Sequence, residues 1–220
     1  MPVICFASSK GGAGKTTSAV LLAGSLSRKD EVILIDADPA KRLLAWANKA
    51  DLPEKLLVHT SAGEAHIHDE IDAANKKAKY VIIDMEGAAT RLNAYIMGES
   101  DLVIIPMGDE QPDAEGAIET LAELAREARS MRREIPVRIL FARTKPAIKS
   151  RLEKSLNAQV RDKIGSFTVE LHRRMAFSAL HNYGGTVYDL NKSEVSGVDK
   201  SIQNSEAFAV EVMNLLQTLN

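Results

Sequence analysis

Cysteine is almost absent from this 220-residue sequence, since Cys5 is the only one. A single thiol can form no intramolecular disulfide and cannot build a cysteine-based metal site. Long apolar runs are also missing: no segment approaches the length that spans a bilayer, and no basic segment precedes the first apolar residues. We therefore expect a soluble protein of the cytoplasm, where thiols stay reduced.

A large charge of one sign is missing as well. The chain has 28 Lys and Arg against 30 Asp and Glu, for a formal net charge of −2. Residues 143–174 nevertheless contain nine Lys and Arg and three Asp and Glu, a local charge of +6 that leaves −8 for the remainder. The overall charge therefore predicts nothing about nucleic acid, but a local basic face is possible.

Short apolar runs rich in Val and Ile alternate with helix-forming sequence. The runs begin at Val3, Glu31, Tyr80, Asp101 and Pro136. They are too continuous for half-exposed antiparallel strands, which favours a parallel sheet covered on both faces. The predicted fold is α/β, with a twisted, mostly parallel β-sheet and helices on both faces. The length suits one domain spanning residues 1–220.

The helical segments are expected to be long and separated by few irregular stretches. No repeat or linker divides the chain, and a surface loop is expected over residues 182–198. A short additional strand is expected near residues 56–59. The predicted helices cover approximately residues 15–27, 113–133, 147–163 and 199–219.

The segment "SKGGAGKTT" nearly matches the phosphate-binding P-loop pattern G-x-x-x-x-G-K-[ST]. Its end is intact, but Ser9 replaces the first glycine. An apolar strand precedes it and a helix-forming run follows, so backbone N–H groups of residues 12–16 would converge on an anion at a helix N-terminus. A glycine-rich turn without a ligand is the alternative. The residues predicted to bind nucleotide are Gly11, Gly12, Ala13, Gly14, Lys15, Thr16 and Thr17.

Acidic residues end two of the apolar runs. Asp36 and Asp38 close "VILIDAD", and Asp84 closes "YVIID". Ligands of open α/β sheets bind at the carboxyl ends of the strands, so these carboxylates should face the phosphate site. Asp84 is placed to hold Mg²⁺ through its water shell, with the Thr16 hydroxyl as a direct ligand. For Asp84 alone, a strand-end cap is the alternative.

The order and spacing of "KGGAGKTT", "IDADPA", "YVIIDMEG" and "DLVIIPM" resemble the ParA family of partition ATPases, within the deviant Walker A group that includes MinD. The similarity continues through "FARTKP" and "ELHRRMAFSALHNYGGTVYD" and covers most of the chain. The small size is similar to short plasmid ParA proteins such as ParF-like members. The resemblance implies a P-loop ATPase that uses ATP and Mg²⁺.

The resemblance also implies catalytic roles for Lys10, Lys15 and Asp38. In this family the lysine matching Lys10 crosses a dimer interface and touches the nucleotide phosphates of the partner subunit, as an arginine finger does. Asp38 matches the acid that orients the hydrolytic water, and Asp36 and Asp84 match acids around Mg²⁺. On physical grounds alone, Lys10 could be a solvated loop lysine.

Other positions are less closely defined by the resemblance. It places Pro106, Met107 and Arg143 beside adenine, although an arginine at a strand end is often only a surface charge. Two departures from the family pattern concern the switches. Ala40 stands where glutamine is usual, and "DMEG" adds Glu86, which is either catalytic or solvated.

The basic stretch "RTKPAIKSRLEKSLNAQVRDK" is the candidate DNA-binding surface. Phosphate contacts would give sequence-independent, salt-sensitive binding, and a dimer would double them. A solvated helix whose charges pair with Glu153 and Asp162 is the alternative. The predicted DNA-binding residues are Lys149, Arg151, Lys154, Arg161, Lys163, Arg173 and Arg174.

The resemblance therefore predicts an ATPase for DNA partition. It would dimerise around Mg-ATP, bind nucleoid DNA nonspecifically, and hydrolyse ATP weakly until a ParB-like or ribbon-helix-helix adaptor stimulates it. The rivals are a ParA-like ATPase that positions a protein complex or conjugation machinery, a MinD-like cell-division regulator and an inactive binding module. Direct membrane binding is not expected, because the tail "SIQNSEAFAVEVMNLLQTLN" is not basic.

Overall fold

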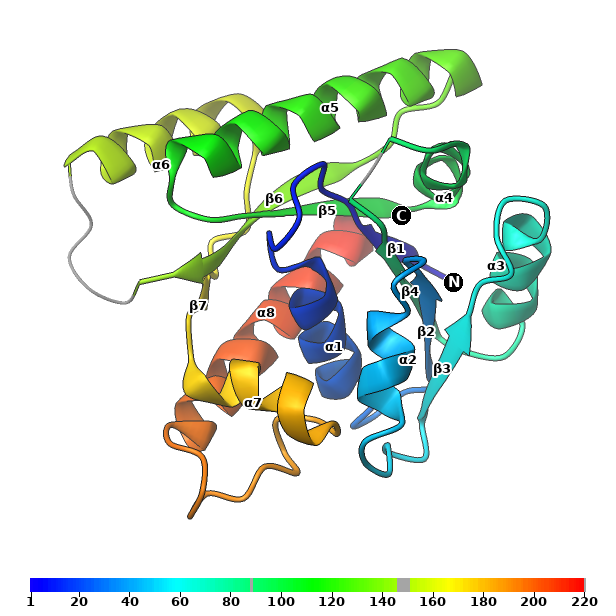
Figure 1. Cartoon of the computed structure of the whole chain (residues 1–220). Helices are drawn as coiled ribbons and strands as arrows, with labels where there is room; N and C mark the ends of the chain where they lie inside the picture. The colour runs from blue at the N-terminus through cyan, green and yellow to red at the C-terminus, as the bar shows by residue number, and fades with distance from the viewer. Residues whose placement is uncertain (88, 146–150, 220) are drawn as a thin grey trace.

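The strands form a seven-stranded sheet in which every neighbouring pair runs parallel (Figure 1). The computed structural model describes residues 1–87, 89–145 and 151–219. The order across the sheet is β3-β2-β4-β1-β5-β6-β7. The strands are β1 (Val3–Phe6), β2 (Val32–Ala37), β3 (Leu56–Thr60), β4 (Tyr80–Met85), β5 (Leu102–Met107), β6 (Val137–Thr144) and β7 (Leu171–His172).

Helices cover both faces of the sheet and produce two apolar cores. One face carries α1 (Lys15–Leu26), α2 (Arg42–Ala47), α7 (Met175–Tyr183) and α8 (Val198–Leu219). The other carries α3 (Ile67–Asn75), α4 (Arg91–Glu99), α5 (Gln111–Met131) and α6 (Arg151–Ile164). Strand side chains alternate between these cores, which explains why the central strands read as unbroken apolar runs.

The strand register brings the acidic residues together. β1 lies between β4 and β5, so the loop after β1 opens at the carboxyl ends of central strands, where open α/β sheets bind ligands. Asp84 of β4 pairs with Asp36 of β2 on one side and with Phe6 of β1 on the other. Two carboxyl groups distant in sequence therefore reach the same edge as the glycine-rich loop.

The predicted fold class is confirmed, and each long helix is found near its expected bounds, as α1, α5, α6 and α8. The strand expected near residues 56–59 is β3, and residues 184–197 contain neither helix nor strand. The sequence reading missed four short helices, α2, α3, α4 and α7, and the two-residue β7. Such short elements are defined by packing against neighbours more than by local propensity.

The C-terminal helix packs into the core beside α1. The Ser205 hydroxyl donates to the carbonyl of Leu21 at 3.0 Å, and the fully buried Phe208 meets Phe167 edge-on with ring centroids 5.4 Å apart. The tail thus buries Phe208, Ala209, Val212 and Leu216 within the fold. Over the ranges that the structure describes, no helix combines the length and hydrophobicity needed to cross a membrane.

Phe208→Ala is expected to lower the free energy of unfolding by about 3–5 kcal/mol, because it removes a buried ring and leaves a cavity. Urea unfolding measures the change. Val210→Ala on the same helix is the control: Val210 is 49% exposed, and its loss should cost less than about 0.5 kcal/mol. Equal effects of the two substitutions would contradict this packing of α8.

Candidate functional site

The loop between β1 and α1 has the backbone of a phosphate cradle. Gly12 and Gly14 adopt left-handed conformations, with φ of 77° and 104°. Gly14 caps α1, where its carbonyl accepts the first helical hydrogen bond from the Ser18 N–H at 2.9 Å. The unpaired N–H groups of this helix start, together with the helix dipole, favour an anion.

Lys15 opens α1 and is buried, with only 8% of its surface exposed. Its ammonium has one long hydrogen bond, 3.4 Å to the carbonyl of Ser8. Burial lowers the pKa of Lys15, while the nearby carboxylates of Asp84 and Asp38 oppose that shift. A buried ammonium with so little compensation is prepared to receive an anion.

Asp84 is fully buried at the end of β4, beside the start of α1. Its Oδ2 accepts a hydrogen bond from the Thr16 hydroxyl at 2.6 Å, whereas its Oδ1 has no hydrogen-bond partner among the described residues. Burial raises the pKa of Asp84 to about 7. An orphaned carboxylate oxygen next to a threonine hydroxyl is a suitable donor set for Mg²⁺.

Asp36 and Asp38 differ in their surroundings. Both oxygens of buried Asp36 accept backbone N–H groups, from Asp38 at 3.2 Å and Leu44 at 3.0 Å, so this carboxyl fixes the turn into α2. Burial raises the pKa of Asp36. Asp38 accepts from the Ala40 N–H at 2.8 Å and lines the cavity above the loop. Ala40 therefore contributes through its backbone N–H, which any residue except proline could supply.

The helix that follows Asp36 also carries the only tryptophan of the sequence, Trp46. Its indole is 2% exposed, and its N–H donates to the carbonyl of Gly185 at 3.0 Å. This bond attaches α2 to the segment after α7. The position of α2 is therefore set at its start by Asp36 and farther along by Trp46.

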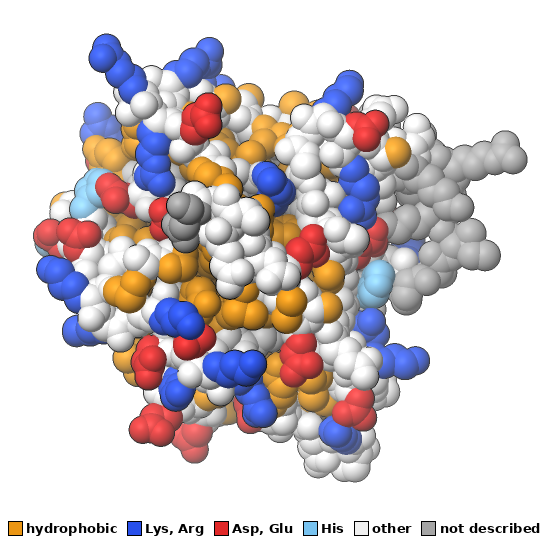
Figure 2. Space-filling view, turned by 180° about the vertical axis from the view of Figure 1, so that it is seen from behind, with side chains coloured by type: hydrophobic (Ala, Val, Ile, Leu, Met, Phe, Trp, Pro, Cys, Tyr) orange, Lys and Arg blue, Asp and Glu red, His pale blue; other side chains and the backbone are white. Residues whose placement is uncertain are grey.

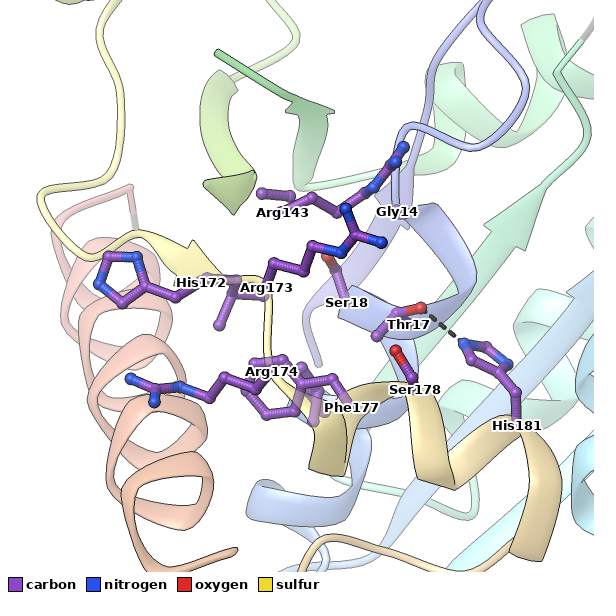
Figure 3. A pocket seen from close by; sticks show the side chains of 13 residues that line it. Gly14, Thr17, Ser18, Arg143, His172, Arg173, Arg174, Phe177, Ser178 and His181 are labelled. Carbon is purple, nitrogen blue, oxygen red and sulfur yellow. Dashed lines mark hydrogen bonds between the residues drawn. The ribbon is translucent and has the colours of Figure 1, made fainter. Parts of the chain in front are cut away.

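Two adjoining cavities open over the loop. The first, about 320 Å³, is polar and is lined by residues 12–17, Asp38, Arg42, Arg143 and His181. The second, about 240 Å³, shares Gly14, Thr17, Arg143 and His181 with the first. Its other lining residues include an apolar set contributed by α1, β6, β7 and α7: Leu21, Ala142, Leu171 and Phe177. Figure 3 shows Phe177 with Thr17, Arg143 and His181 around this cavity. A phosphate chain fits the first cavity and a flat, mostly apolar group fits the second.

Arg143 lies at the junction of these cavities. Its backbone is left-handed, with φ of 60°, and its guanidinium donates to the carbonyl of Gly12. Such a conformation is unfavourable for a side chain other than glycine and is often found at functional sites. Pro106 and Met107, which were expected beside the base, are instead buried in β5 and line neither cavity.

The structure adds residues from α7 that the sequence reading did not single out. His181 Nε2 lies 2.7 Å from the Thr17 hydroxyl, and Phe177 and Ser178 line the second cavity. Burial and the positive charges of Lys49 and Arg42 lower the pKa of His181. The segment "ELHRRMAFSALHNY" signalled the family, but only the packing of α7 reveals which of its side chains reach the loop.

Lys10 does not line the polar cavity over the loop. Its ammonium lies 2.5 Å from Asp113 Oδ1 on α5 of the same chain. Ser9, the residue that departs from the standard pattern, also contacts α5: its N–H donates to the Thr120 hydroxyl at 2.9 Å. The start of the loop is thus attached to α5.

Those predicted DNA-binding residues whose side chains the structure describes lie in different parts of the fold. Lys149 lies outside the described residues, and Arg151 and Lys154 belong to α6. Arg173 and Arg174 line the second cavity. Arg161 and Lys163 lie in the last turn of α6.

Arg161 is used inside the fold. Its guanidinium pairs with Glu170 at 2.9 Å, donates to the carbonyl of Phe167 and lies over the ring of Phe141, 4.7 Å from the centroid. Lys163, in contrast, is exposed. Figure 2 shows Lys and Arg interspersed with Asp and Glu on the opposite side of the molecule from the view of Figure 1, without a broad area of one sign.

The chain is similar to known proteins over nearly its whole length. The family model described as VirC1 protein matches residues 1–219. The sequence is 34% identical to Protein ParA of Rhizobium radiobacter over 98% of each chain. It is 23% identical to the maintenance of carboxysome distribution protein A of Halothiobacillus neapolitanus, over 90% of this chain and 91% of that protein.

Solved structures share the fold. The ATP complex of a McdA variant from Cyanothece superimposes with a TM-score of 0.74 at 19% identity, covering 96% of each chain. This similarity concerns the fold. The family model and the relative from Rhizobium radiobacter confirm the resemblance to the ParA group that the loop and the acidic residues indicated.

Asp84→Asn is expected to stabilise the nucleotide-free protein at alkaline pH. Because the pKa of folded Asp84 is raised to about 7 from its ordinary 3.8, the folded state binds the extra proton between these values and loses stability as pH rises through them. The stability advantage of the variant should grow by about 3 kcal/mol from about pH 5 to about pH 8 in urea unfolding. If the free energies of unfolding of the two proteins changed equally with pH, burial would not raise the pKa of Asp84 in the way described.

Proposed function

The chain belongs to the VirC1 protein family, a ParA-like group, and we propose that it is a Mg-ATP-dependent ATPase that partitions DNA. The observation that carries this proposal is the pair of buried charged residues Lys15 and Asp84 beside the glycine-rich loop, with the half-buried Thr16 hydroxyl bonded to Asp84. An ammonium and a carboxylate are both kept from water there, which is costly without a ligand that uses them. A nucleotide phosphate with its metal ion supplies the missing opposite charges.

The residues present fit Mg-ATP. The loop amides and Lys15 would bind the phosphates, and the Thr16 hydroxyl and the orphaned Asp84 oxygen would hold the ion. When bound, Mg²⁺ neutralises charge on the phosphate oxygens. Asp36 would assist through a bound water, and its two accepted backbone N–H groups keep its carboxylate in the turn before α2. The second cavity, between Arg143 and Phe177, would receive the base.

Hydrolysis is assigned to Asp38 and Lys10. Asp38 lines the phosphate cavity and is held in place by the Ala40 N–H, which suits a carboxylate that orients water. Lys10 would stabilise transition-state charge on the nucleotide of a second subunit. ATP would therefore be part of a dimer interface, and its hydrolysis would weaken that interface.

The proposed output is nonspecific DNA binding by the dimer on the nucleoid, ended by an adaptor that stimulates hydrolysis. Arg161 is excluded from the DNA-contacting set because it is paired within the fold, which leaves Lys163 and its neighbours on α6. Dimerisation would double these contacts, so that a small patch suffices only with ATP. Arg173 and Arg174 are reassigned to the nucleotide side.

A second candidate keeps the same ATP cycle and changes the cargo. Similarity to a carboxysome distribution protein favours positioning of a protein complex. The two candidates share the ATPase site and differ only in the adaptor, so the site itself cannot favour either. Co-purification of the adaptor would distinguish a centromere-binding partner from a cargo protein.

Two substitutions separate binding from hydrolysis. Lys15→Ala should reduce ATP affinity at least about 100-fold, because it removes the buried ammonium. Asp38→Ala should retain ATP, lower the hydrolysis rate at least about 10-fold and accumulate dimers, measured by light scattering and phosphate release. Normal hydrolysis by Asp38→Ala would show that another residue orients the water.

DNA binding is tested with arbitrary-sequence duplex in ATP, ADP or no nucleotide. The ATP-bound dimer should bind DNA, and its affinity should fall at least about 10-fold between about 50 and 200 mM salt. Lys163→Ala should weaken binding, with Lys192→Ala, an exposed lysine before α8, as the control. ATP-dependent dimers without DNA affinity would overturn the DNA output and leave a protein target.

A further inference from the structure

The ion pair between Lys10 and Asp113 joins the start of the nucleotide loop to α5. The ammonium and Oδ1 are 2.5 Å apart, and the two residues are 103 positions apart in the sequence. The Lys10 side chain is 39% exposed, whereas that of Asp113 is only 14% exposed. Asp113 is therefore the more confined residue of the pair, whereas the more exposed Lys10 side chain is free to move toward another anion.

Asp113 is fixed by its place in the fold. It lies in the first turn of α5, where the helix dipole favours a carboxylate. Its Oδ2 packs against Gly108, where an added Cβ would lie only 2.2 Å from that oxygen. Only glycine at position 108 leaves room for the carboxylate in this place.

Ser9 strengthens the same attachment. Besides the bond to Thr120, its hydroxyl lies 3.0 Å from the carbonyl of Gly116 and 3.0 Å from Glu119 Oε2. An added Cβ at Gly116 would lie 3.2 Å from Lys10 Cβ, so the loop and α5 are in close contact. The backbone at residues 9 and 10 is thus held on α5, and the Lys10 side chain can change partners without moving the loop.

We infer that Asp113 is a positioning residue that holds Lys10 in its own subunit and thereby raises the ATP-dependent threshold for dimerisation. The inference rests on the proposed function, in which Lys10 acts on the nucleotide of a second copy. One ammonium cannot serve both anions, so each dimer must exchange two Asp113 ion pairs for two phosphate contacts. The protein stays monomeric until bound ATP outcompetes the carboxylate.

Asp113→Asn tests the inference, with Glu115→Gln as the matched control. Glu115 is an exposed acid on the same helix whose Oε1 accepts a hydrogen bond from the Gln111 side-chain amide at 3.2 Å, and its replacement changes the net charge equally. The first readout needs no nucleotide: acetylation of Lys10 by acetic anhydride, followed by mass spectrometry and normalised to exposed Lys163. Asp113→Asn should be labelled several-fold faster than wild type, and Glu115→Gln at the wild-type rate.

The second readout is the protein concentration at which half of the chain is dimeric with ATP, measured by light scattering. Asp113→Asn should lower it about five-fold, because two partly exposed ion pairs no longer oppose the dimer. If Asp113→Asn leaves the rate of Lys10 acetylation unchanged, Asp113 does not hold Lys10. If acetylation is faster but the protein concentration for half-dimerisation with ATP is unchanged, the ion pair does not oppose dimerisation.

Failure of the proposed function has a separate signature. A wild-type protein that remains monomeric with ATP overturns the role of Lys10 in a second subunit. Acetylation of Lys10 then still tests whether Asp113 retains Lys10 within one subunit. Thermal unfolding identifies a misfolded variant. If Asp113→Asn misfolds, Asp113→Ser replaces it, with the same two outcomes for and against.

Discussion

Burial of a carboxylate beside a buried ammonium is the constraint on which this site depends. Asp84 ends the central strand β4 with no exposed surface, and Lys15 begins α1 a short distance away. Neither charge is fully compensated within the described chain, since one Asp84 oxygen has no hydrogen-bond partner. The fold tolerates this cost because the two large apolar cores on either side of the sheet stabilise it. Stability is thus given up at the edge where a ligand restores it.

The features of this site that depend on a continuous stretch of sequence could be predicted. Continuous Val and Ile runs identified the central strands, and the glycines with Lys15 identified the loop, because local pattern and spacing suffice for both. Contacts between distant segments could not be predicted. The Lys10 and Asp113 pair, the Arg161 and Glu170 pair and the Thr17 and His181 contact all depend on how helices pack. A basic residue in sequence says little about whether its charge is already paired.

The reassignment of Arg161 and Arg173 changes how the basic segment is understood. Its charge was one property in the sequence, but the structure divides it among internal pairing, the cavities over the glycine-rich loop and the exposed end of α6. Arg173, between β7 and α7, and Phe177 on α7 both line the second cavity, so a movement of this stretch would change the shape of that cavity.

The lone tryptophan gives the protein an intrinsic optical reporter. Trp46 is buried on α2, which begins at Arg42, a residue that lines the cavity over the glycine-rich loop together with Asp38. Indole emission responds to polarity and to the loss of a hydrogen bond such as the one to Gly185. With no second tryptophan in the sequence, the tryptophan fluorescence of the unlabelled chain reports on α2 alone.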